Sequence, residues 1–269
     1  MPSVRLKSAR ELEIMRQAGQ IVADALVMLR GELREGVSTR QLNDLAAQYL
    51  HSRGALTSYT AVGFDGVVCV SINEEIVHGI PGPRLLRAGD LVSLDIAAIH
   101  GGYHGDAAVT AGVGLLSPQA RHLMRATEEA LALGISLATP GRHLHDISAA
   151  IDAFVEAQGL SVVRNLVGHG IGRSMWEEPQ VPNYRQETRG VALRPGMVFT
   201  IEPMVMAGKP DTETLSDGWT IVTRDRKLAA HFEHTIAVTS DGPRVLTQPT
   251  DAGAMWARST GGLGTGGLT

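Results

Sequence analysis

The sequence predicts an α+β fold made of two related halves, in which helices pack against strands. Two observations support this prediction. Stretches with helical periodicity alternate with apolar runs that are typical of strands. In addition, three landmarks occur twice in the same order: a helix bounded by glycines, a His-Gly-Ile triplet, and an apolar strand that ends in an acidic residue. Three recurrences in one order indicate an internal repeat.

The chain is expected to begin with two helices. Ser8 and Glu11 have the spacing of a capping box, in which side chains at the helix start satisfy unpaired backbone N–H groups. Apolar residues then recur at helical spacing, so we expect a helix over residues 9–31. Ser38 opens a similar box, and its helix should end at Gly54.

The rest of the chain contains further helices and strands. Ser117 and Pro118 are typical of an N-cap and a first helical position, and they predict a helix to about Leu137. Another helix is expected over residues 145–159. Residues 250–269 are rich in glycine and hold too few apolar side chains to join a core, so we expect a disordered tail there. Apolar runs predict strands at residues 67–72, 91–99, 197–206 and 233–239.

The repeat divides the chain into halves at about residues 36–112 and 141–240. His78 and His169 each begin a His-Gly-Ile triplet. The segment LRAGDLVSLD then matches LRPGMVFTIE, so that an acidic residue follows a glycine by six positions in both halves. These acids are Asp95 and Glu202.

Composition narrows the possible functions. The chain has 269 residues, 43% of them hydrophobic, and a net charge of −4 without a basic stripe or an acidic block. This balance argues against electrostatic binding to nucleic acid or to a membrane surface. The single cysteine, Cys69, excludes an internal disulfide. No stretch reaches the roughly 18 apolar residues of a membrane span, and the start does not resemble a signal peptide. We therefore expect a cytoplasmic protein.

The stretch VSLDIAAIHGGYHGDAAVT predicts a hairpin that carries two acids. If His100-Gly101 forms the turn, Asp95 lies directly opposite Asp106; if Gly101-Gly102 forms it, the two are diagonal neighbours on one face. A three-residue turn would separate them. Two carboxylates this close among apolar residues require a shared proton or a cation, unless both acids lie at a solvated rim.

Two further acids and one histidine complete a candidate metal site. Glu202 and Glu233 lie in apolar strands, where an isolated carboxylate is rarely buried without a partner. His169 lies between glycines, in either an ordinary turn or a turn that leaves the imidazole open to a metal. Four carboxylates with one imidazole suit Mn, Fe or Co, and the excess of acids favours two ions. Each acid could instead be a paired core residue.

These residues and the sequence segments around them resemble those of a known family. The segments SINEEIVHGIPG, LDIAAIHGGYHGDAA, VGHGIGRSMWEEPQVPNY and LRPGMVFTIEP are similar to those of the type I methionine aminopeptidases of bacteria. The resemblance extends over residues 8–248. It implies the α+β pita-bread fold, with two pseudo-twofold-related halves, antiparallel sheets and helices outside. It also implies a single catalytic domain over residues 1–249.

The resemblance implies a role for each candidate residue. The chain should bind two divalent ions (Co, Mn, Fe or Zn), with Asp106 and Glu233 as bridging ligands. A hydroxide between the ions would attack the carbonyl after an N-terminal methionine that precedes a small residue. Glu202 would handle protons and His78 would contact the substrate, and these two are the candidate catalytic residues. The implied metal ligands are Asp95, Asp106, His169, Glu202 and Glu233.

The sequence departs from the family at two places. Trp176 occupies the position of a family histidine that hydrogen-bonds the substrate near the scissile carbonyl. Its indole either packs away from the site or donates its N–H in place of the imidazole; indole cannot accept a proton. The loop GFDGVVC is three residues shorter than its family counterpart, whose aromatic residues line the methionine pocket. Residues expected to bind substrate here are Phe64, Cys69, His78, Met175, Trp176 and Trp219.

The candidate residues and the family resemblance are compatible with three functions. The first is a metalloaminopeptidase acting on the N-termini of nascent polypeptides, with ribosome association as a further expectation. The alternative is a metal-binding pita-bread protein with weak or no turnover, which Trp176 and the short loop favour. The third is an X-Pro peptidase, which needs extra histidines and usually a longer N-terminal domain. We expect a monomer without a nucleic-acid or membrane partner.

Overall fold

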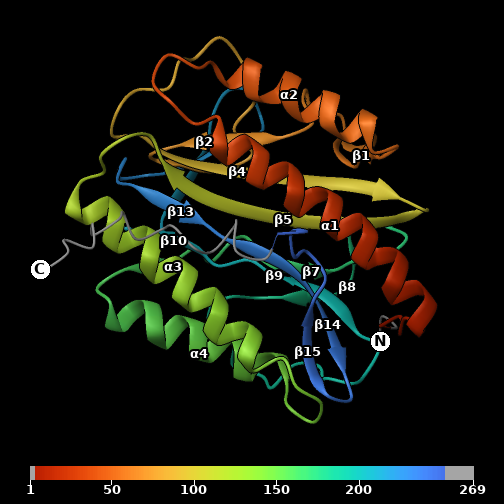
Figure 1. Cartoon of the computed structure of the whole chain (residues 1–269). Helices are drawn as coiled ribbons and strands as arrows, with labels where there is room; N and C mark the ends of the chain where they lie inside the picture. Colours follow the sequence, from red (N-terminus) through yellow and green to blue (C-terminus); the bar gives the residue numbers. More distant parts are fainter. Residues whose placement is uncertain (1–3, 252–269) are drawn as a thin grey trace, which may run out of the picture.

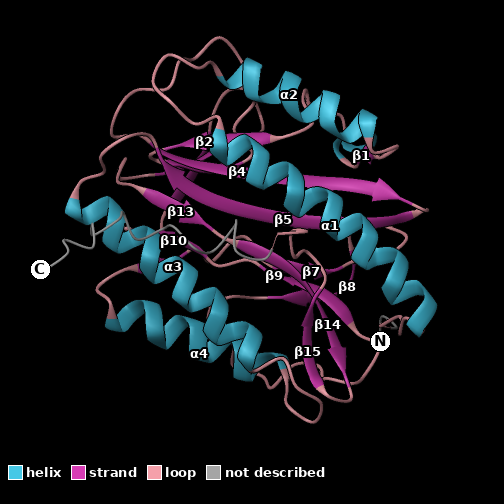
Figure 2. Ribbon diagram, in the orientation of Figure 1, coloured by secondary structure: helices cyan, strands magenta, loops and turns pink. Residues whose placement is uncertain are grey.

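A curved antiparallel sheet forms the centre of the protein (Figures 1 and 2). The computed structural model describes residues 4–251. The largest sheet has nine strands, in the order β1-β4-β5-β14-β9-β7-β8, with β2 added beside β4 and β15 beside β14. Two three-stranded sheets, β13-β10-β6 and β11-β12-β3, complete the strands. The strand bounds are β1 Leu56–Thr57, β2 Cys69–Ile72, β3 Glu75–Val77, β4 Leu91–His100, β5 Tyr103–Gly112, β6 Ser161–Val162, β7 Gly168–Gly170, β8 Glu177–Val181, β9 Val198–Ile201, β10 Met204–Met206, β11 Thr212–Thr214, β12 Ile221–Thr223, β13 Ala229–His231, β14 Glu233–Thr239 and β15 Gly242–Val245.

In the described part of the chain, residues 4–251, four α-helices cover the outer face of the sheets. Figure 1 shows α1 lying across β4 and β5 with α2 above it, and α3 and α4 side by side over the other half. The α1–β5 contact is so close that Gly19 and Gly105 touch through their backbones: a Cβ on Gly105 would lie 2.6 Å from Gly19 N. The helix bounds are α1 Ala9–Gly31, α2 Thr39–Ser52, α3 Pro118–Ser136 and α4 Leu144–Ala157, and a 3-10 turn covers Tyr59–Val62.

The predicted helix starts are confirmed. Both capping boxes form, at Ser8 with Glu11 and at Ser38 with Gln41. Ser117 caps α3 by accepting a hydrogen bond from a backbone N–H. The helices end within two residues of the expected positions.

The internal repeat is visible as pairs of equivalent contacts. Gly36 N donates to Leu86 O (2.9 Å), and Gly141 N donates to Leu193 O (3.1 Å). The N-cap of α2 bridges to the strand-like segment before β4, and the N-cap of α4 bridges to the matching segment before β9. The sheet order repeats this relation, because β4-β5 and β9-β14 are arranged about the central β5–β14 pairing. The fold is therefore the predicted pita-bread fold with two related halves.

The turn of the β4–β5 hairpin decides between the two predicted arrangements of the acids. His100 pairs with Tyr103, so Gly101 and Gly102 form the turn, with φ of 59° and 78°. Two positive φ angles are what a tight two-residue hairpin needs. Asp95 therefore pairs with Ala108 rather than with Asp106, and the two acids are diagonal neighbours on one face of the hairpin.

The predicted strand over residues 197–206 is wrong in its continuity. It is two strands, β9 and β10, which belong to different sheets. Pro203 has no N–H to continue the β-ladder, so the strand is interrupted at Glu202 and Pro203, between the end of β9 and the start of β10. The amide of Asn183 replaces the missing ladder contacts: it donates to Glu202 O (3.2 Å) and accepts from Glu202 N (3.4 Å). The run at 67–72 likewise starts later, at Cys69.

Two expectations concern the ends of the chain and the membrane. Among residues 4–251, no helix is long and apolar enough to cross a membrane. Most of the predicted tail, residues 252–269, lies outside the described residues. Thr250, which we placed in that tail, bonds to Asp24 on α1 through both its N–H and its hydroxyl (2.7 Å each).

Candidate metal centre and active site

The predicted site residues lie around one cavity of about 190 Å³ between the two halves of the sheet. The acids come from the strands of both halves: Asp95 from β4, Asp106 from β5, Glu233 from β14, and Glu202 from the end of β9. Loops supply most of the apolar wall. The predicted residues that line this cavity are Phe64, Cys69, His78, Asp95, Asp106, His169, Met175, Trp176, Glu202, Trp219 and Glu233.

The centre of the cavity has the donor atoms that a divalent cation needs. Ligand atoms of Asp106, His169 and Glu233 lie within 4.8 Å of one another. His169 Nε2 is 3.6 Å from Asp106 Oδ2 and 3.9 Å from Glu202 Oε1. Among the described residues, Asp106 Oδ1 is buried and has no hydrogen-bond partner. A buried carboxylate oxygen without a partner is costly, so this donor set fits a cation.

The electrostatics of the cluster show the same requirement. Burial raises the pKa of Asp95 and of Glu233, and the charge of Asp106 raises both further. Burial also raises the pKa of Glu202, to about 7. Burial by itself would lower the pKa of His169, but the hydrogen bond to Asp106 and the charge of Glu202 raise it to about 9. Without a cation, the carboxylates cannot all be ionised at neutral pH.

Neighbouring groups fix the orientation of the candidate ligands. The hydroxyl of Tyr59 donates to Asp95 Oδ1 (2.6 Å), and that of Thr200 donates to Glu202 Oε1 (2.6 Å). His169 Nδ1 lies 3.0 Å from Gly170 O. If Nδ1 carries the proton that this contact needs, Nε2 is left as a lone pair facing the acids, which is the usual arrangement of a ligating histidine.

The expectation that His169 lies in a turn is wrong. It lies on β7, between β8 and β9. Its flanking glycines allow those strands to approach closely: a Cβ on Gly170 would lie 2.2 Å from Glu178 O, and one on Gly168 would lie 2.6 Å from Thr200 O. The glycines therefore serve the packing of the sheet, and this packing places the imidazole at the acids.

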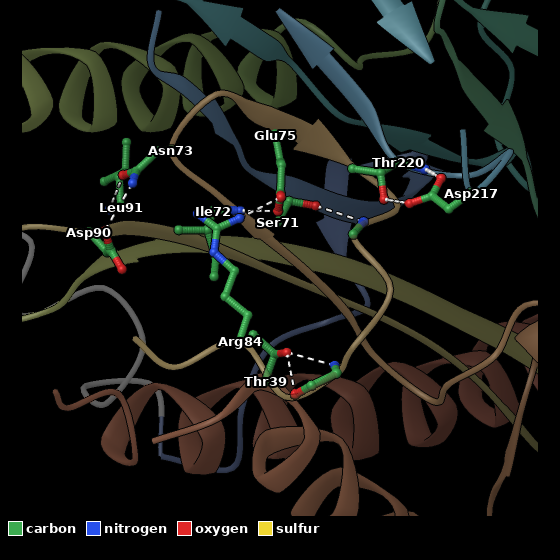
Figure 3. A network of polar contacts seen from close by, with 12 residues as sticks. Thr39, Ser71, Ile72, Asn73, Glu75, Arg84, Asp90, Leu91, Asp217 and Thr220 are labelled. Carbon is green, nitrogen blue, oxygen red and sulfur yellow. Dashed lines mark hydrogen bonds and ion pairs between the residues drawn. The ribbon is translucent and has the colours of Figure 1, made fainter. Parts of the chain in front are cut away.

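His78 is held in an unusual backbone conformation at the edge of the cavity. Its φ is 61°, which is uncommon for a residue with a side chain and is frequent at functional sites. Figure 3 shows a polar network that includes Ser71, Asp217 and Thr220. Ser71 Oγ accepts a hydrogen bond from the N–H of Gly79, the residue after His78 (3.1 Å), and Thr220 Oγ1 donates to Asp217 (2.6 Å). Thr220 Oγ1 also lies 3.5 Å from His78 O. Burial lowers the pKa of His78, which favours the neutral ring.

Aromatic residues form the apolar wall of the cavity. The ring of Phe64 packs edge-on against Tyr59 and against Trp219, with centroids 5.4 Å apart in both pairs. Met175 packs on the same cluster, which also includes Cys69. The shortened loop thus still supplies an aromatic wall.

Trp176 lies at the rim of the cavity with 57% of its surface exposed. The alternative in which its indole packs away from the site does not match this position.

Sequence reasoning missed three residues of the site. Tyr59 and Thr200 orient acids, but hydroxyl residues in apolar surroundings carry no specific signal. His231 lines the cavity, and neither of its ring nitrogens has a partner among residues 4–251. Its position two residues before Glu233 could have indicated it, although the two residues lie on different strands, β13 and β14.

Comparison with known proteins identifies the class to which this fold and site belong. Residues 13–240 match the model of metallopeptidase family M24. The chain therefore belongs to this family, whose members use divalent metal ions of the kind that the acid and histidine cluster fits.

Within the family, the chain is similar to bacterial methionine aminopeptidases, as its sequence segments predicted. It is 49% identical to methionine aminopeptidase 1 of Bacillus subtilis, covering 90% of this chain and 98% of that protein. It is 44% identical to the methionine aminopeptidase of Escherichia coli, covering 91% and 94%. The crystal structure of methionine aminopeptidase from Thermotoga maritima superposes with a TM-score of 0.89 at 40% identity, covering 91% and 99%.

More distant structures share the fold alone. Prolidase from Pyrococcus furiosus superposes with a TM-score of 0.75 at 23% identity, and the match covers 90% of this chain but 65% of that one.

Proposed function

We propose that this protein is a methionine aminopeptidase, which removes the N-terminal methionine from proteins whose second residue is small. One observation carries the proposal: four acids and one histidine from both halves of the sheet meet beside a single apolar cavity. The similarity to methionine aminopeptidases over nine-tenths of the chain supports it.

The proposed metal ligands divide between two divalent ions. Asp106 and Glu233, which come from the adjacent central strands β5 and β14, would hold both ions. Asp95 would complete one ion's shell, and His169 with Glu202 the other's. When bound, the ions supply an activated hydroxide and polarise the scissile carbonyl.

Two residues are proposed to act directly on the substrate. Glu202 is proposed to take up and release the protons of the reaction, and in the metal-free protein its pKa is near 7, while Thr200 holds one of its oxygens. His78 faces the cavity with a ring that burial keeps neutral, so it can donate one hydrogen bond to the peptide and accept another.

The methionine side chain is proposed to bind against the apolar wall. Phe64, Cys69, Met175 and Trp219 would contact its side chain, and sulfur–aromatic contact adds to the apolar burial. Trp176 at the rim would contact the peptide near the scissile carbonyl, where its N–H can donate a hydrogen bond but cannot accept a proton.

The proposal also places the protein in the cell. We propose a monomer in the cytoplasm, formed as a single catalytic domain over residues 1–249, that acts on the N-termini of nascent polypeptides and associates with the ribosome to reach them.

The experiment that tests the activity is the release of free methionine from the peptide Met-Ala-Ser. The purified protein is stripped of metal and reloaded with Co, Mn or Fe, and Glu202→Ala is the control. Metal-dependent release that Glu202→Ala abolishes supports the proposal. Metal uptake without release, on this peptide and on a panel with other first residues, contradicts it.

One specific observation favours the alternative, a metal-binding protein with weak turnover: an indole stands where the family has an imidazole. Trp176→His tests it. Because one donor near the developing charge is worth on the order of 100-fold in rate, we expect kcat/KM to rise by about that factor. An unchanged kcat/KM would show that the missing imidazole does not limit turnover. Trp176→Phe is the matched control, since it keeps the ring and removes the N–H.

A further inference from the structure

The loop that presents Met175 and Trp176 to the cavity is anchored on the N-terminal segment. This loop, residues 172–176, connects β7 to β8 and is defined here as the rim loop. The first residue of β8, Glu177, accepts hydrogen bonds from the N–H groups of Arg173 (3.0 Å) and Ser174 (3.3 Å) through Oε1. Its carboxylate therefore organises the loop from inside.

The other oxygen of that carboxylate is bound by a residue 170 positions away. Lys7 Nζ lies 2.6 Å from Glu177 Oε2, and the two side chains are only 5% and 7% exposed. Lys7 is itself fixed by its backbone, because its N–H donates to Gly196 O (2.7 Å). The ammonium group thus has a rigid base from which to hold the loop.

The ion pair packs closely against the backbone of the rim loop at Gly172. A Cβ on Gly172 would lie 2.6 Å from Glu177 Oε1 and 2.7 Å from Lys7 Cε. Gly172 O also accepts from His104 N on β5 (2.8 Å). Breaking a buried ion pair leaves an uncompensated charge in the interior, so Glu177 would move toward solvent if Lys7 lost its charge.

A second contact ties the same loop to the start of α1. The guanidinium of Arg173 stacks on the ring of Tyr103 at 4.5 Å, and the Tyr103 hydroxyl donates to Glu11 Oε1 (2.7 Å). Glu11 belongs to the capping box of α1. The rim loop is therefore held at both of its sides by the first residues of the described chain.

We propose that Lys7 is a positioning residue of the active site: through Glu177 it fixes the rim loop so that Met175 and Trp176 meet the substrate. This role rests on the proposed function, since it assigns the loop to peptide binding. Lys7 does not line the cavity and acts only through the loop. Loss of its charge is expected to weaken substrate binding more than it slows the chemical step.

The first readout needs no activity. In metal-free protein carrying Trp219→Phe and Trp256→Phe, Trp176 is the remaining tryptophan. We expect Lys7→Met to lower the fluorescence anisotropy of Trp176 and to increase its quenching by acrylamide. The matched control is Arg16→Met, which removes the exposed Arg16–Glu13 pair and should change neither quantity. Unchanged anisotropy and quenching in Lys7→Met overturn the proposal.

The second readout uses the metal-loaded enzyme without the tryptophan substitutions. A misplaced binding loop can cost up to about 100-fold in efficiency, so we expect Lys7→Met to raise KM for Met-Ala-Ser about ten-fold or more while kcat changes less than three-fold. A fall in kcat with KM unchanged would contradict the positioning role. A loss of activity that results from unfolding of the variant would contradict it as well. If the wild type releases no methionine, the proposed function fails, and the fluorescence readout still decides whether Lys7 holds the loop.

A double variant guards against misfolding. Glu177→Gln keeps the oxygen that Arg173 and Ser174 bind and removes the buried charge, so Lys7→Met with Glu177→Gln should fold at least as stably as Lys7→Met. We expect the double variant to raise KM no more than either single change, because both break one interaction. Additive effects on KM would show that Lys7 acts by another route and would overturn the proposal.

Discussion

The two halves of the repeat place an acid at the equivalent position but hold it differently. Asp95 lies within the continuous ten-residue strand β4 and is bound by Tyr59. Glu202 lies where the equivalent strand breaks, and Thr200 and Asn183 hold it. Burial raises the pKa of Asp95 well above its usual value, whereas that of Glu202 reaches about 7. The proposed role of Glu202, at the break, is to move protons as well as to hold an ion, whereas the proposed role of Asp95, in the unbroken strand, is only to hold an ion.

The largest expected effect separates these two roles. Glu202→Gln keeps the shape of the side chain but removes its charge and its ability to take up a proton, so we expect kcat to stay about 10²–10⁴-fold below the wild type even at saturating metal. Asp95→Asn should instead lower metal affinity, and excess metal should restore part of its activity. Titrating both variants with Mn and measuring methionine release checks this. Equal recovery of the two variants by metal would contradict the distinction.

A pH effect on stability should appear in the metal-free protein. The pKa of His169 is about 9 in the folded state against an ordinary 6.5, so the folded protein holds a proton that the unfolded chain has released in this window. The stabilisation is therefore present below pH 6.5 and is lost as the pH rises toward 9. Because one pKa unit corresponds to about 1.4 kcal/mol, we expect the free energy of unfolding to fall by about 3 kcal/mol.

The measurement is urea unfolding of metal-stripped protein at pH 6.5 and pH 9. Glu202 adds to the same trend, but between its ordinary 4.5 and its pKa of about 7. Buried His231 and His234, whose pKa burial lowers to about 3, give a trend of opposite sign that is confined to pH below 6.5. Saturating Mn should flatten the dependence, since the ion replaces the protons. Stability that rises from pH 6.5 to 9 would show that the cluster is not protonated as described.

The smallest expected effect concerns the support of the broken strand. Asn183→Ala removes both hydrogen bonds to the backbone of Glu202, and we expect it to lower the free energy of unfolding by about 1–3 kcal/mol and to reduce kcat. Tyr59→Phe is the control in the other half, because it removes the one bond to Asp95. It should reduce metal affinity rather than kcat at saturating metal. Thermal unfolding and single-metal titrations distinguish the two results.

Local chemistry made much of the fold predictable. The capping boxes at Ser8 and Ser38 need only residues three apart, and the repeat needs only similar words at two places. The acids could be assigned to one face because the hairpin turn allowed only a few registers. The choice among those registers depended on which residues adopt positive φ, and three candidate turn residues in a row left that open.

Long-range packing accounts for what the sequence did not reveal. Glycine is needed on both sides of His169 because β8 and β9 approach the backbone closely there, and no local sequence pattern shows this approach. The pairing of Lys7 with Glu177 joins residues 170 positions apart, and charged residues are ordinarily exposed. The break after Glu202 did have a local signal, because Pro203 interrupts the apolar run. The apolar residues on both sides of Pro203 made the run resemble one strand.

The central pairing of β5 with β14 has a consequence for how the chain is made. During synthesis β5 is complete at residue 112, but its partner begins only at residue 233. At about 5–20 residues per second, the ribosome takes roughly ten seconds to add the intervening chain. Throughout that interval, the first half presents an open row of unpaired N–H and C=O groups of the kind that invites pairing with other chains. During synthesis, the edge of β5 is thus exposed until β14 has been made and can pair with it.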